Sequence, residues 1–104
     1  MIKYQLVIQF KASTVDDYDN LINLENELIS ILKETARVDG HDFGSGEANI
    51  FIITCNPQVT FQAIKKHLEK KDLLKNIRAA YREQNSDDYK PVWPEDSEDE
   101  FKVI

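Results

Sequence analysis

One short stretch, residues 38–53, limits the possible folds more than any other part of the sequence. It contains all three glycines of the chain and continues without interruption into the apolar run Ile50-Phe51-Ile52-Ile53. Glycines beside Asp, Asn and Ser are typical of turns, and an apolar run of this length is typical of a buried strand. The stretch therefore predicts a β-hairpin with a polar tip, whose arms cover residues 36–43 and 47–55.

The N-terminal segment carries the clearest strand pattern. Residues 2–11 alternate apolar side chains with mostly polar ones, which is the period of a strand with one buried face. Residues 89–93 predict a further, short strand, and Pro91 restricts that strand to the edge of a sheet. We therefore expect strands at both ends of the domain in addition to the hairpin.

Two helices are expected on either side of the hairpin. Apolar residues recur at three- and four-residue steps over 15–34, and Ser13 or Thr14 is suited to cap this segment. Asn56 followed by proline is a typical helix start and predicts a second helix over residues 57–71. Both segments present one apolar stripe, so both are expected to pack on a sheet.

The segment after the second helix is ambiguous. Residues 76–83 alternate as a strand does, although Leu73, Leu74, Ile77 and Tyr81 also fit a continued helix. We favour the strand, because residues 85–88 form a turn sequence that would join it to the edge strand as a hairpin.

The order of elements predicts an α+β fold of ferredoxin-like type, the split βαβ arrangement. In this arrangement (βαββαβ plus a short C-terminal edge strand) two helices cover one face of an antiparallel sheet. We expect one domain over residues 1–94. Residues 95–104, with five carboxylates against one lysine, are expected to form an acidic tail that frays, with docking of Phe101, Val103 and Ile104 as the alternative.

Composition excludes several classes of function. The net charge of −6 argues against nucleic acid as a partner, because phosphate neutralisation supplies most of that affinity. The apolar runs are too short to span a bilayer, so no membrane contact is expected, and a cytoplasmic location follows by default. The single cysteine, Cys55, excludes an internal disulfide and is expected to be a buried thiol.

The motifs that give ferredoxin-like domains familiar chemistry are missing from this sequence. The third strand lacks the basic and aromatic motif of RNA-recognition domains. No Cys-x-x-Cys of a metallochaperone and no glycine-rich anion loop of an acylphosphatase follows the first strand, where residues 12–15 read Ala-Ser-Thr-Val. We therefore expect no cofactor, no metal and no catalytic constellation of a known type.

The candidate site lies in the hairpin and depends on its register. With a three-residue turn at 44–46, His41 faces Asn49 and shares a sheet face with Glu47, whereas a two-residue turn at Ser45-Gly46 sets Asp42 opposite Asn49. We favour the three-residue turn, because it keeps the apolar residues of both arms in the core. The candidate ligand- or partner-binding residues are Asp39, His41, Asp42, Glu47, Asn49 and Phe51.

Three interpretations of these residues compete. In the first, these residues shape the turn. In the second, together with an open sheet face bearing Val7, they bind a protein, a small ligand or a second copy of the chain. In the third, His41 acts as an acid or base oriented by Glu47 or Asp39. We favour a non-catalytic binding or interaction module, with an enzyme as the less favoured alternative.

A resemblance of style adds one further alternative. As a small, acidic single domain with a polar loop, the chain resembles bacterial immunity and antitoxin proteins, although no motif carries the resemblance. The resemblance implies a protein that neutralises a basic partner. Homodimerisation through the open sheet face is the other form of protein partnership that the sequence suggests.

Overall fold

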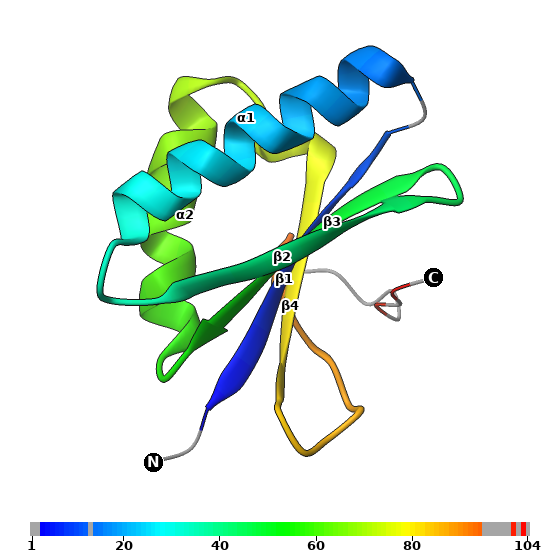
Figure 1. Ribbon diagram of the computed structural model, residues 1–104. Coiled ribbons are helices and arrows are strands. Elements are labelled where there is room, and N and C mark those ends of the chain that lie inside the picture. The colour runs from blue at the N-terminus through cyan, green and yellow to red at the C-terminus, as the bar shows by residue number, and fades with distance from the viewer. Residues whose placement is uncertain (1–2, 13, 95–100, 102, 104) are drawn as a thin grey trace.

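The fold consists of a twisted five-stranded sheet with two helices on one face. The computed structural model describes residues 3–12, 14–94, 101 and 103. Its elements are, in chain order, β1 (Tyr4–Lys11), α1 (Val15–Leu32), β2 (Arg37–Gly44), β3 (Glu47–Thr54), α2 (Pro57–Lys70), the short 3-10 turn η1 (Leu74–Asn76), β4 (Ile77–Glu83) and β5 (Lys90–Trp93). Figure 1 shows the two helices crossing on the same side of the sheet.

The strand order is β2-β3-β1-β4-β5, and all four neighbouring pairs are antiparallel. The predicted α+β class, with two helices on one face of an antiparallel sheet, is confirmed, and the strand order is broadly ferredoxin-like. The strand predicted over residues 76–83 is also confirmed as β4. Within the described part of the chain, neither helix combines the length and the apolar character needed to cross a membrane.

Side chains that cap the first turns fix where both helices begin. The Thr14 hydroxyl accepts a hydrogen bond from the backbone N–H of Asp17, and the Asp17 carboxylate accepts one from the N–H of Thr14. The Asn56 side chain accepts from the N–H of Val59, and Pro57 occupies the first position of α2. These bonds satisfy backbone donors that have no partner inside the helix.

The main core fills the space between the helices and the sheet. Strand alternation directs Leu6 and Ile8 of β1 toward the helices, where they meet α1 and α2. The fully buried side chains of this core include Leu6, Ile8, Leu21, Leu28, Leu32, Ile50, Ile52, Phe61, Ile64 and Leu68. Ile29, by contrast, is half exposed on the outer side of α1.

Charged side chains also join the two helices. Glu27 of α1 accepts hydrogen bonds from Lys71 at both carboxylate oxygens, and His67 Nε2 lies 2.7 Å from one of them, Oε2. The hydrogen bond from Lys71 lowers the pKa of Glu27 below its ordinary value of 4.5, with the His67 contact adding to this effect and desolvation opposing it. The acidic α1 and the basic end of α2 are therefore complementary at this contact.

Cys55 differs from its predicted environment. The residue follows β3 directly and is exposed, so the expected buried thiol is wrong. The apolar run ends at Ile53, and Thr54 already directs its hydroxyl to Thr60 of α2. The chain has thus left the sheet by position 55, which explains the exposure.

Candidate functional site

The hairpin closes with a two-residue turn, so the favoured three-residue register is wrong. Ser45 and Gly46 are the central residues, with φ of 55° and 79°. Positive φ at both positions matches the type I′ turn, whose twist suits the flanking strands. Asp42 consequently lies opposite Asn49, and Phe43 lies opposite Ala48.

A β-bulge interrupts β2 near its start. The register shifts between Val38 and Gly40, so Asp39 is an extra residue, and its carboxylate lies 3.2 Å from the Arg37 guanidinium. Gly40 has a φ of 137°, which side-chain-bearing residues rarely adopt. The bulge keeps Val38 facing the core although the turn differs from the predicted one.

His41 faces the helices, away from Glu47. It pairs with Ile50 of the main core, and its Nδ1 lies 3.0 and 3.1 Å from the two carboxylate oxygens of Glu25 in α1. Because a carboxylate only accepts, Nδ1 is the donor. Tyr18 packs edge-on against both His41 and Phe43, with centroid distances of 5.9 and 5.3 Å. The suggested pairing of His41 with Glu47 as an acid–base couple is therefore wrong.

Asp42, Glu47, Asn49 and Phe51 lie on the opposite face, which we call the open face. There Asn49 accepts a hydrogen bond of 3.0 Å from Gln9 Nε2 of β1, and both side chains are buried. A satisfied buried amide pair of this kind fixes the lateral alignment of β1 and β3. Asp42 is exposed beside the turn. The structure thus brings four of the six predicted residues to one face.

Glu47 differs from its neighbours in one of its carboxylate oxygens, Oε2. It lies opposite Lys11 in the β1–β3 register. Its Oε2 atom is buried and has no hydrogen-bond partner among the described residues. A buried carboxylate oxygen without a donor costs stability, and such an exception to polar satisfaction calls for a reason.

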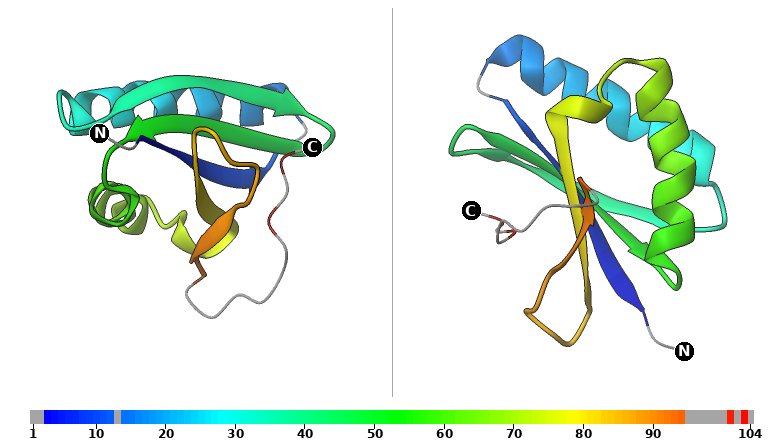
Figure 2. Two further views of the ribbon diagram at one scale, coloured as in Figure 1. Left: turned by 90° about the horizontal axis from the view of Figure 1, so that it is seen from below. Right: turned by 180° about the vertical axis from the view of Figure 1, so that it is seen from behind.

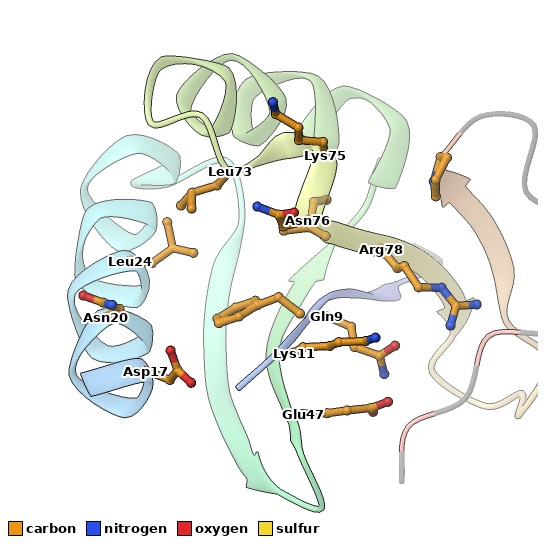
Figure 3. A pocket seen from close by; sticks show the side chains of 13 residues that line it. Gln9, Lys11, Asp17, Asn20, Leu24, Glu47, Leu73, Lys75, Asn76 and Arg78 are labelled. Carbon is orange, nitrogen blue, oxygen red and sulfur yellow. The ribbon is translucent and has the colours of Figure 1, made fainter. Parts of the chain in front are cut away.

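That oxygen belongs to a residue that lines a pocket of about 660 Å³ at the end of the sheet. Figure 3 shows the pocket between α1 and the ends of β1, β3 and β4. Its charged lining residues are Lys11, Asp17, Glu47, Lys75 and Arg78, and its apolar ones include Phe10, Leu24, Leu73 and Ile77. The pocket therefore combines an apolar wall with charges of both signs.

Most of this pocket could not be found by reading the sequence. Glu47 is the candidate residue that lines it, whereas Lys11, Lys75 and Arg78 come from three other segments. The basic residues between positions 65 and 82 suggested only a charged surface. Their approach to Glu47 depends on how the ends of β1, β3 and β4 pack beside α1 and η1, which no local pattern reveals.

A second apolar cluster lies on the open face. It contains Val7, Ala80 and Phe101, with Phe51 and Tyr89 packed against it. The prediction that Val7 forms part of an uncovered binding face is therefore wrong, because Val7 is fully buried. Phe101 therefore docks, as in the alternative to the expected fraying, while residues 95–100, 102 and 104 of that tail lie outside the described residues.

Metal chemistry finds no support in the described residues. In the parts of the chain covering 3–12, 14–94, 101 and 103, no three His, Cys, Asp or Glu side chains gather in a way that could hold a metal ion. His41 and His67 contact different glutamates of α1, Glu25 and Glu27, at separate places. The pocket therefore remains the candidate site.

Comparison with known proteins adds information on the fold. No protein-family model matches the chain, and no curated protein matches it. Among solved structures, the de novo designed protein Foldit4 is similar, with a TM-score of 0.54 and 17% identity over 81% of this chain and 98% of that one. This similarity supports the α+β arrangement, and any function must be derived from the site itself.

Proposed function

We propose that this chain is a non-catalytic binding module whose ligand occupies the pocket beside Glu47. The single observation that carries the proposal is that Glu47, which lines a pocket of about 660 Å³, has a buried carboxylate oxygen without a donor among the described residues. Ligand sites of about 300–1,000 Å³ are usual, with a largely apolar lining and a few polar groups that orient the ligand. A bound N–H group would supply the missing partner.

The charges around the pocket indicate the class of ligand. A carboxylate without a donor favours an ammonium group, since charge-assisted hydrogen bonds are the stronger ones. Lys11 and Lys75 at the same pocket favour a carboxylate on the ligand, and Leu24 and Leu73 offer an apolar surface. We therefore propose a small zwitterion, a free amino acid or a short peptide, as the ligand.

The test is a thermal-shift screen of the twenty common amino acids and a set of dipeptides. A compound that binds only the folded chain and is present at a concentration of 100 times its Kd stabilises the chain by about 2.7 kcal/mol, so the melting temperature of the chain rises. The increase should be absent in Glu47→Gln, which keeps the shape of the side chain but removes its charge.

Asp42→Asn is the matched control for this screen. It makes the same chemical change on the same hairpin, at an exposed residue that does not line the pocket. It should retain the full increase in melting temperature. Equal responses from the parent and Glu47→Gln, or no response to any compound, would contradict the proposal.

A further inference from the structure

The centre of the open face is a small apolar patch with polar borders. Val7 of β1 and Ala80 of β4 lie opposite each other in the register, and both are fully buried. The next pairs on this face are Gln9 with Arg78 and Gln5 with Arg82. We call Val7 and Ala80, with Phe51 and Tyr89 at their margin, the open-face patch.

The side chain of Phe101 covers the open-face patch. Phe101 is only 6% exposed, and its ring lies 5.1 Å from the ring of Tyr89. The Arg78 guanidinium lies over the same ring at 5.5 Å from its centre. Val103, two residues further on, packs against the same cluster. Figure 2 shows that both helices lie on the other side of the sheet from this face.

The opposite margin of the patch is held by a network around Arg82. Arg82 Nε donates to Gln5 at 3.1 Å, and its Nη1 donates to three backbone carbonyls between Glu83 and Ser86. The Tyr89 hydroxyl lies 3.4 Å from the same Gln5 oxygen. These contacts join the Tyr89 side chain to β1 and hold the β4–β5 loop against β4, so the sheet and this loop form this wall of the patch.

Phe101 is joined to the domain by a sequence that has little to bury. The residues between Pro94 and Phe101 are five carboxylic acids and one serine. The cluster around Phe101 is also separate from the main core, with the sheet backbone between the two. Phe101 is therefore able to leave the patch without unpacking the helices.

We propose that the open-face patch is a peptide-docking site for an acidic segment of another protein that carries Phe and, two residues later, an aliphatic residue. The chain's own Phe101 and Val103 occupy this site in cis. The aromatic ring fits over the Val7–Ala80 pair beside Arg78, and the arginines at the borders favour acidic residues next to the Phe. A partner must displace the tethered segment, whose effective concentration is on the order of millimolar.

The test uses a labelled synthetic peptide of residues 95–104 as the probe and the full-length chain as the receptor. In Phe101→Ala the patch loses its occupant, and we expect this variant to bind the probe at least tenfold more tightly than the parent does. A probe with Ala in place of its Phe should bind neither protein. Phe101→Leu, which retains part of the apolar contact, should give an intermediate affinity.

Val59→Ala is the matched control, since it trims an exposed apolar side chain on α2, remote from the open face. It should bind the probe as weakly as the parent. Circular dichroism of each variant establishes that the fold is intact, and Phe101→Leu preserves the test if Phe101→Ala unfolds.

Three outcomes would overturn the proposal. The first is that folded Phe101→Ala or Phe101→Leu fails to bind the probe at millimolar concentration. The second is that the parent and the variants bind the probe equally. The third is that the parent is a dimer and Phe101→Ala is a monomer, which would indicate exchange of tails between copies. Because the probe experiment does not involve Glu47, it can fail or succeed independently of the amino-acid screen.

Discussion

The two faces of the sheet are built from the same strands yet are closed in different ways. On the helix face, Leu6 and Ile8 of β1 pack under two capped helices in the main core. On the open face, Val7 of the same strand is covered by Phe101, which an acidic segment links to the domain. The contrast suggests that the helix face supplies most of the stability, while the open face contributes less.

The largest difference should appear between two phenylalanines. Phe61→Ala removes a ring buried between α2 and the sheet, and we expect a loss of about 4 kcal/mol in the free energy of unfolding. Phe101→Ala should cost only about 1–2 kcal/mol, since the tail can undock locally while the main core stays packed. Urea unfolding of both variants measures the difference, and equal losses would show that the tail belongs to the cooperative core.

Neighbouring residues of β1 provide a narrower comparison. Ile8→Ala should cost about 3 kcal/mol, because it opens a cavity that the helices cannot fill. Val7→Ala removes fewer methyl groups beneath a ring that is able to shift, and should cost about 1 kcal/mol. Thermal and urea unfolding measure both losses of stability. A larger loss for Val7→Ala than for Ile8→Ala would contradict this prediction.

The two faces of the hairpin should respond in opposite directions. His41→Ala removes a hydrogen bond to the partly buried Glu25 and the edge contact with Tyr18, so we expect a loss of about 1 kcal/mol. Glu47→Gln removes the charge from a carboxyl group with one buried oxygen that has no donor among the described residues, so stability should be unchanged or greater by up to about 1 kcal/mol. Melting temperatures measured without ligand decide this, and a marked loss in Glu47→Gln would indicate that the carboxylate is structural.

The smallest expected effect is the pH dependence of the contact between Glu27 of α1 and Lys71 at the end of α2. Because hydrogen bonding to Lys71 depresses the folded pKa of Glu27, this residue contributes stability above its ordinary pKa of 4.5 and loses that contribution as the pH falls through the folded pKa. The contribution of such a partly exposed pair should be less than about 1 kcal/mol. Unfolding midpoints of the parent and Glu27→Gln should converge as the pH falls below 4.5. A difference between the two unfolding midpoints that does not change with pH would mean that packing of the side chain, and not its charge, causes the effect.

The local patterns of the sequence were sufficient for the fold. Period-two alternation predicted β1, and the caps at Thr14 and Asn56 predicted where the helices begin. The register of the hairpin could not be derived in the same way, because the bulge at Asp39 keeps Val38 in the core with a two-residue turn as well. Phe43 was the missed signal, since the correct turn directs this ring toward the helices.

The candidate site was only partly predictable for a related reason. Glu47 could be selected because it lies in the one concentrated polar stretch of the chain. The residues that complete the pocket or cover the open face, such as Lys75 and Phe101, are distant from it in sequence. Their positions depend on tertiary packing, about which periodicity and turn chemistry carry no information.

Strand alternation in β1 also bears on how descendants of this chain can diverge. Leu6, Val7 and Ile8 are consecutive, yet the first and third belong to one apolar cluster and the second to another. Substitutions at Val7 and Ala80 would reshape the open-face patch and leave the packing of both helices untouched. Substitutions that change the open-face patch can therefore accumulate without matching changes in the main core, because the sheet backbone separates the two sets of contacts.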